Sequence, residues 1–196
     1  MTAFDLYPPS GEWTVEDVER FPEDNRRREL VDGSLILRPG QTPTHSIITT
    51  HLFAILDQGC PAAFEVIPGI QIRFSETTAL VPDLVVVHAG RNPGSVTYFN
   101  PEDVVLAVEV LEERSQNLDR FLKPAVYAAA GISCFWRVET GGGIVVQEHH
   151  LADPATGYRA AGNHTDRLTV EKPWSIDVPV STLAPRSLRA ATSPRP

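Results

Sequence analysis

One glutamate stands inside a strand-like apolar run of this sequence, and it limits what the chain can fold into. The run is VVLAVEVL, and the glutamate is Glu109. A continuous apolar run of this length is typical of a central strand in a sheet that is covered on both faces. A carboxylate in such a strand is costly to bury unless it is paired with a cation or binds a metal ion. Glu109 therefore predicts either a buried ion pair or a functional site.

A second carboxylate, Asp83, directly precedes another apolar run, LVVV. By itself, an aspartate after a proline at the start of a strand can be a turn residue. Together, Asp83 and Glu109 stand at the ends of what we expect to be neighbouring strands, where they can converge on one divalent cation. Hard cations prefer oxygen ligands, and Mg²⁺ commonly takes one or two carboxylates together with water and substrate phosphates. We therefore predict a metal site on these two residues.

The pattern of apolar residues predicts strands and helices that alternate along the centre of the chain, which favours an α/β fold with a mixed sheet. Thr14 with Asp17 predicts a helix start, and Asp32-Gly33 predicts the turn of a hairpin. Pro124, inside a predicted helix, is expected to kink it or to start a new turn. Helices are expected over 41–59 and 117–131, and strands within 27–39, 64–74, 80–87, 103–111, 133–139, 143–151, 158–162 and 167–174.

Length and composition predict that the chain folds as a single domain. The chain has 196 residues, of which 42% are hydrophobic, and this is near the usual size of a single domain. We predict a flexible N-terminal arm over 1–12, one domain over 13–185 and a disordered tail over 186–196. No apolar run approaches the ~20 residues that a membrane span needs, and the first residues lack the pattern of a signal peptide. The expected location is therefore the cytoplasm, with no membrane partner.

Charge and cysteine content exclude several classes of function. The net charge of −8, from 25 acidic and 17 basic residues, argues against a general nucleic-acid-binding surface. Any contact with nucleic acid must therefore use a local patch. There is no G-x-S-x-G motif, and neither Cys60 nor Cys134 stands near an evident histidine partner, so a nucleophilic hydrolase finds little support. Both cysteines are expected to be structural.

Lys123, in the predicted helix after Glu109, has the charge and reach to position an attacking water or to hold a phosphate. A metal ion, a metal-bound water and a cationic side chain are the minimum parts for phosphodiester hydrolysis. Taken alone, Lys123 is expected to be a helix-surface lysine, whose replacement by alanine costs little stability.

Five segments carry a resemblance to a known family. They are RRELVDGSL, PTHSIITTHL, VPDLVVV, LAVEVL and LDRFLKPAVYAAAGISCFWRVE, in this order. At this spacing they resemble the Uma-type restriction endonuclease family of the PD-(D/E)XK nuclease superfamily, and the resemblance extends from about Trp13 to Leu183. It implies a restriction-endonuclease-like fold, with a mixed central sheet flanked by helices.

The resemblance also implies roles for single residues. Asp83 and Glu109 correspond to the metal-binding pair, with Mg²⁺ as the expected cofactor and Mn²⁺ able to replace it. The superfamily often carries its lysine two residues after the second acid, but that position is Leu111 here, and Lys123 matches the place of the lysine in this family. Glu29 matches an N-terminal acid that reaches the metal or orders its water. Supporting positions are matched by Asp119, Tyr127 and His45, the last of which can equally cap or pack a helix.

These observations predict a Mg²⁺-dependent endonuclease that hydrolyses phosphodiester bonds, with DNA as the expected substrate. A homodimer is expected, because nucleases that cut both strands are often symmetric dimers. One departure concerns residues 112–115, which read EERS where the family commonly has a small polar stretch such as S-P-S-T. Extra carboxylates beside a metal site raise the local negative charge. The alternative is therefore a weakly active or inactive domain that keeps the fold and acts as a binding or regulatory module.

Overall fold

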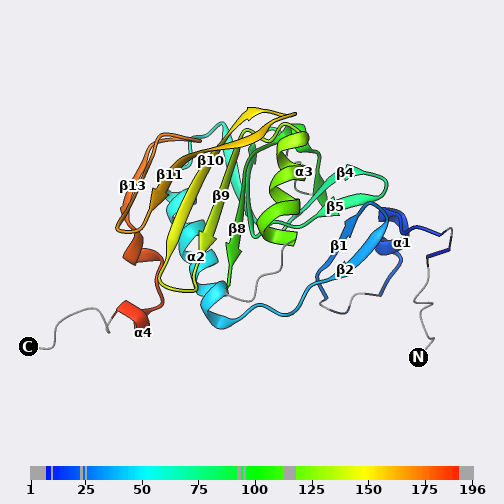
Figure 1. The fold of residues 1–196 in the computed structure, drawn as a ribbon, viewed down its shortest axis with the longest axis horizontal. Coiled ribbons are helices and arrows are strands. Elements are labelled where there is room, and N and C mark those ends of the chain that lie inside the picture. The colour runs from blue at the N-terminus through cyan, green and yellow to red at the C-terminus, as the bar shows by residue number, and fades with distance from the viewer. Residues whose placement is uncertain are drawn as a thin grey trace, which may run out of the picture.

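The computed structural model describes residues 8, 9, 11–22, 24, 26–91, 94, 96–112 and 118–189. Its centre is a six-stranded sheet with the order β11-β10-β9-β8-β6-β3 (Figure 1). β8 and β9 run parallel, and the other neighbouring pairs run antiparallel. The predicted mixed sheet is therefore confirmed. Its strands are β3 (Phe64–Pro68), β6 (Leu84–His88), β8 (Val104–Leu111), β9 (Cys134–Glu139), β10 (Val145–Asp153) and β11 (Gly157–His164).

A second sheet of five strands has the order β2-β1-β5-β4-β7, and a two-stranded sheet pairs β12 with β13. The strands of these two sheets are β1 (Arg28–Val31), β2 (Ser34–Leu37), β4 (Gln71–Ser75), β5 (Thr78–Leu80), β7 (Tyr98–Phe99), β12 (Arg167–Val170) and β13 (Ile176–Pro179). The α-helices are α1 (Val15–Glu19), α2 (Pro43–Gln58), α3 (Lys123–Ala129) and α4 (Arg186–Arg189). The short strands β5, β7 and β13 were not predicted, because so few residues show no periodicity.

The hairpin of β1 and β2 turns at Asp32-Gly33, as predicted. Asp32 has φ 44° and Gly33 has φ 72°. Positive φ at both central residues defines a type I′ turn, whose twist matches that of the flanking strands. The turn fixes the register, in which Arg28 pairs with Leu37. This register decides which side chains of the two strands share a face.

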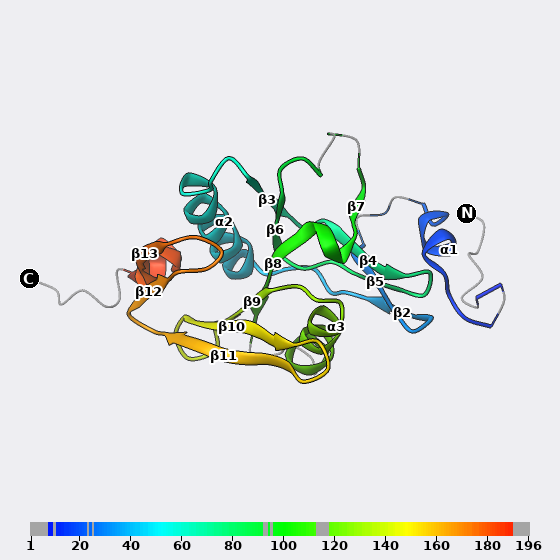
Figure 2. The same ribbon diagram turned by 90° about the horizontal axis from the view of Figure 1, so that it is seen from above.

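Helices cover both faces of the central sheet (Figure 2). On one face, Leu84 and Val86 of β6 pack with Ile48 and Leu52 of α2. On the other face, Val85 and Val87 pack with Tyr127 of α3. Because successive side chains of a strand point to opposite faces, Val85, Val87 and Ala107 are turned toward α3. Glu109, two residues after Ala107, is turned the same way and contacts Lys123 and Tyr127 of α3.

A wide π-type turn, Leu118–Leu122, leads into α3. Pro124 occupies the first turn of α3, where its missing N–H leaves no helical hydrogen bond unmade. The prediction that Pro124 starts a new turn is confirmed. Lys123 is thereby placed at the first position of the helix, on the side that faces the sheet.

The predicted domain boundaries stay predictions. Residues 1–7 and 10 of the predicted arm, and residues 190–196 of the predicted tail, lie outside the described residues. Within the tail, Arg186–Arg189 forms the short helix α4. Among the described residues, every helix is too short or too polar to span a membrane.

The turn at Gly33 generates the first prediction. A Cβ on Gly33 would lie 2.7 Å from the Cβ of Glu12, and its φ is left-handed. Gly33→Ala should therefore lower the free energy of unfolding by about 1–2 kcal/mol, measured by urea denaturation. Gly142→Ala is the matched control, because a Cβ there meets no atom within 4 Å. If both variants unfold at the same urea concentration, the strained turn does not contribute as described.

Candidate active site

The structure brings Asp83 and Glu109 together. β6 and β8 are antiparallel, with Leu84 opposite Val108, so the start of β6 lies beside the end of β8. Both carboxylates are buried, with exposed fractions of 5% and 2%. They line one cavity of about 130 Å³, which we call the acidic cavity and define by Asp83, Glu109 and Asp119. The predicted pair therefore shares a face and a cavity.

Asp83 is surrounded by hydrogen-bond donors. Its Oδ1 accepts from Arg27 at 2.8 Å and from Gln41 at 3.2 Å. Its Oδ2 accepts from the backbone N–H of Val110 at 2.8 Å and lies 3.1 Å from Nε2 of His45. Burial raises the pKa of Asp83, but the contacts with His45 and Arg27 outweigh it and hold the pKa well below its usual range. Asp83 is therefore ionised and fixed in place at neutral pH.

Lys123 is fully buried, so the expectation of a helix-surface lysine is wrong. The reason is tertiary: α3 lies on the central sheet, and its first residue faces the carboxylates. The ammonium Nζ lies 2.7 Å from Glu29, 3.0 Å from Glu109 and 3.2 Å from Asp119. Burial lowers the pKa of Lys123, but these three carboxylates raise it more. Lys123 lies behind the acidic cavity, whose described lining it does not join.

Glu109 is held from the side of α3. Both of its oxygens accept from Lys123, at 3.0 and 3.2 Å, and Oε1 also accepts from the hydroxyl of Tyr127 at 2.7 Å. Burial raises the pKa of Glu109 to about 7, against the lowering by Lys123, and the negative charges of Asp83 and Glu29 add to the rise. Glu109 is therefore a carboxylate whose charge is costly in this buried cluster.

Three cations face four carboxylates in this cluster. Arg38 contributes one contact of 2.5 Å to Oδ2 of Asp119 and one of 3.4 Å to Oε2 of Glu29. Arg27 contributes the contact with Asp83. Oε2 of Glu29 and Oδ1 of Asp119 are buried and accept no hydrogen bond, although each lies near a cation. The cluster therefore keeps one negative charge in excess when all its members are ionised. Its members are Arg27, Arg38, Lys123, Glu29, Asp83, Glu109 and Asp119.

The sequence analysis missed Arg27, Arg38 and Gln41. The signal that could have found the arginines is the register of the hairpin. Arg28 pairs with Leu37, and the N–H of Arg38 donates to the carbonyl of Arg27 at 2.9 Å, so these two arginines stand opposite each other. Like charges directly opposite on a sheet are destabilising unless other charges compensate them. The carboxylates of the acidic cavity supply that compensation.

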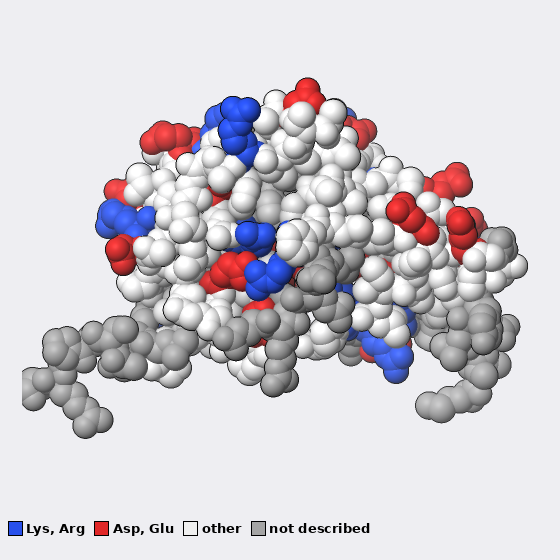
Figure 3. All heavy atoms as spheres, viewed as in Figure 1, with Lys and Arg blue, Asp and Glu red and all other residues white. Residues whose placement is uncertain are grey.

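Charged side chains are dispersed over the face of the molecule that Figure 3 draws. Basic and acidic side chains stand there in small mixed groups, without one broad basic surface.

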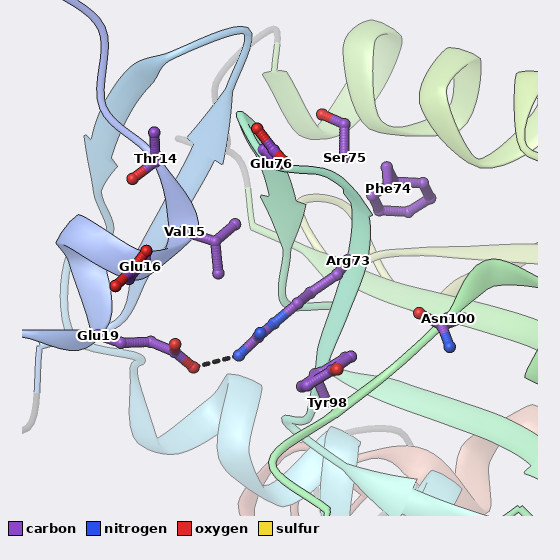
Figure 4. Close-up of a pocket in the computed structure, with 10 residues that line it drawn as sticks. All are labelled: Thr14, Val15, Glu16, Glu19, Arg73, Phe74, Ser75, Glu76, Tyr98 and Asn100. Atoms are coloured by element: carbon purple, nitrogen blue, oxygen red, sulfur yellow. Dashed lines mark hydrogen bonds and ion pairs between the residues drawn. The ribbon is translucent and has the colours of Figure 1, made fainter. Parts of the chain in front are cut away.

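Another cavity, of about 480 Å³, lies between α1 and β4 (Figure 4). There, Arg73 pairs with Glu19 and stacks over the ring of Tyr98. Glu16 and Glu76 also line it, and this negative charge disfavours a phosphate ligand.

Among the described residues, no group of three or more His, Cys, Asp and Glu side chains is arranged to hold a metal ion. The carboxylates of the cluster contact its arginines and lysine. Mg²⁺ needs one or two carboxylates, with water and phosphate completing its shell. Asp83 and Glu109 supply such a pair of oxygen donors on one wall of the acidic cavity.

The profile of the Uma2 family, described as "Putative restriction endonuclease", matches residues 15–175. The chain belongs to this family. A crystal structure of "a putative nuclease belonging to DUF820" from Anabaena variabilis is similar to the protein, with a TM-score of 0.69 and 14% sequence identity. The match covers 87% of this chain and 96% of the other. The Uma2 protein described here therefore has the restriction-endonuclease-like fold that the sequence predicted. The comparison with curated proteins gave no match.

Removal of the buried ammonium should be strongly destabilising. Lys123→Met leaves three buried carboxylates without their shared cation, and we expect a loss of about 3–5 kcal/mol in the free energy of unfolding at pH 7. The loss should shrink at acidic pH, where the carboxylates take up protons. Lys172→Met, at an exposed position, is the control. Urea denaturation of both variants measures the effect, and a loss below 1 kcal/mol for Lys123→Met would contradict this account.

The pKa of Glu109 predicts a pH dependence of stability. Its ordinary pKa is 4.5, and burial raises it to about 7 in the folded protein. Between these values the folded state holds a proton that the unfolded state has released, so the stability that Glu109 contributes falls as the pH rises. The stability of the wild type minus that of Glu109→Gln should therefore decrease from pH 4.5 to 7. Denaturation at a series of pH values measures it, and a difference that increases would contradict the assignment.

Proposed function

We propose that this Uma2 protein is a Mg²⁺-dependent endonuclease that hydrolyses phosphodiester bonds in DNA. The observation that supports it best is the convergence of two buried carboxylates, Asp83 and Glu109, on one cavity. Membership of a family described by endonuclease activity supports the same reaction class. The position of these residues agrees with the pair that the sequence resemblance implies.

The residues present fit a hard divalent cation. Asp83 and Glu109 would hold it, and Oε2 of Glu29, which accepts no hydrogen bond, has acceptor capacity left for a water nearby. Mg²⁺ or Mn²⁺, when bound, would supply positive charge to the phosphate and activate water. A cation in the acidic cavity would compete with Arg27, which now holds Asp83.

The side chains around the pair keep it in place. His45 and the N–H of Val110 orient Asp83 from two sides. Lys123 and Tyr127 hold Glu109 from behind. In this proposal Lys123 is a positioning residue, because its Nζ contacts carboxylates and lies outside the described lining of the cavity. A role of Lys123 on the attacking water, and of Glu29 in ordering it, stays a prediction of the sequence.

A second candidate function is binding without cleavage. One observation favours it: Arg27, Arg38 and Lys123 already pair with the carboxylates of the cluster, so a metal ion would have to displace Arg27 from Asp83. A domain that keeps these ion pairs in the cell would act as a binding or regulatory module and would not hydrolyse phosphodiester bonds.

The homodimer and the cytoplasmic location also stay predictions. Light scattering on the purified protein would test whether it forms a homodimer.

A cation titration joined to a plasmid-nicking assay tests the proposed function. Mg²⁺ or Mn²⁺ should raise the melting temperature by an amount that grows with concentration, because it binds the folded state. The same ions should support nicking of supercoiled DNA. Glu109→Gln should remove most of the thermal shift and lower the nicking rate about 100-fold or more, because metal catalysis supplies several kcal/mol.

The matched control is Glu171→Gln, at an exposed position distant in sequence from the acidic cavity. It should keep both the thermal shift and the nicking rate. Equal thermal shifts in the wild type and Glu109→Gln would mean that the cation binds elsewhere. A thermal shift without nicking at any cation concentration would favour the binding module.

A further inference from the structure

A cavity of about 640 Å³ adjoins the acidic cavity, and four arginines line it. We call it the arginine cavity and define it by Arg26, Arg27, Arg28, Arg38 and residues 39–41. Arg28 begins β1, Arg26 and Arg27 precede it, and Arg38 follows β2. No acidic residue is part of its described lining. Four of the 17 basic residues of a chain with net charge −8 thus meet at one place.

The two cavities are neighbours, because Arg27, Arg38 and residues 39–41 line both of them. The acidic cavity presents the carboxylates Asp83 and Glu109, and the arginine cavity presents guanidinium groups. An extended polyanion that lies in the arginine cavity would pass these shared residues and bring its next unit toward the carboxylates. A compact anion would occupy one cavity and would not extend toward the other.

The arginines have capacity for a ligand. Arg26 and Arg28 share one carboxylate, Asp24, at 3.4 and 2.6 Å, and the guanidinium of Arg28 also stacks over the ring of Phe21. A single carboxylate thus faces two cations. The side chain of Arg26 is 65% exposed. Nε and one terminal nitrogen of Arg27 are buried without a hydrogen-bond partner. Unsatisfied buried donors cost free energy, and Asp83 leaves the guanidinium of Arg27 incompletely paired.

We propose that the arginine cavity binds the sugar-phosphate backbone of the nucleic-acid strand beside the bond that is cut. The identity of that bond rests on the proposed function. Arginine suits this ligand because its planar guanidinium binds phosphate oxygens in a bidentate manner. The cavity is thus the local patch through which an acidic protein contacts nucleic acid. Arg27 would change its partner from Asp83 to phosphate when a cation occupies the acidic cavity.

Binding of a short fluorescein-labelled DNA strand, measured by fluorescence anisotropy over a series of salt concentrations, tests the proposal. Ca²⁺ replaces Mg²⁺ in these measurements, as a hard cation with the same preference for oxygen ligands. The double variant Arg26→Ala/Arg28→Ala should bind at least 10-fold more weakly. The slope of log K against log salt should fall in magnitude by about 1.4, since each contact to a single strand contributes about 0.7.

The matched control is Arg159→Ala/Arg186→Ala, which removes the same charge from exposed positions in β11 and α4. Figure 1 shows α4 on the opposite side of the molecule from β1 and β2. This control should keep the slope and the affinity of the wild type. Arg26→Lys/Arg28→Lys should keep the slope, because the charge remains, and a thermal melt of each variant verifies the fold.

The outcomes separate the two proposals. Wild-type slope and affinity in Arg26→Ala/Arg28→Ala, or no salt-dependent binding by the wild type, would overturn the arginine cavity as a nucleic-acid site. If the wild type nicks plasmid DNA while the double variant binds normally, this inference fails and the proposed function stands. If binding depends on Arg26 and Arg28 but no divalent cation supports nicking, the inference stands and hydrolysis fails.

Discussion

The buried ammonium of Lys123 is the interaction on which the rest of this structure depends. It lies within 3.2 Å of carboxylates from three elements: Glu29 of β1, Glu109 of β8 and Asp119 of the turn before α3. An unpaired carboxylate would be costly in this interior, and so would an unpaired ammonium. These contacts therefore connect the second sheet, the central sheet and α3 through the side chain of Lys123. The same ion pairs form the candidate active site and hold the packed elements together.

This sharing explains the composition of the acidic cavity. Buried carboxylates in one cluster repel one another when they are ionised, and the protein has to compensate that repulsion. Here Arg27 and Arg38 take part in the compensation from the hairpin, while Lys123 does so from behind. Because the two arginines also line the neighbouring cavity, their charge is placed where a phosphate would need it. Stability and proposed function thus draw on the same side chains.

The sequence predicted the local parts of this arrangement well. Asp32-Gly33 determines a type I′ turn by itself, and Thr14 with Asp17 forms the capping box that starts α1. Apolar runs predicted the central strands, and the cost of a carboxylate in such a run singled out Glu109. Alternation along a strand then places Asp83 and Glu109 on one face once β6 and β8 pair. Each of these follows from short-range geometry and burial.

Only the tertiary structure determines which basic side chains pair with the buried carboxylates. No periodicity reveals that Lys123 faces inward, because a short helix shows its buried side only when it packs on a sheet. The pairing of Arg27 and Arg38 with the carboxylates could not be predicted from the sequence either. The two arginines lie opposite each other because of the register of the hairpin, and they contact Asp83 and Asp119 because the second sheet packs against the central sheet. Residues far apart in sequence become one charge cluster through packing. The sequence by itself determined which carboxylates stand next to or inside apolar strands. The packing of three elements determined which basic side chains form ion pairs with them.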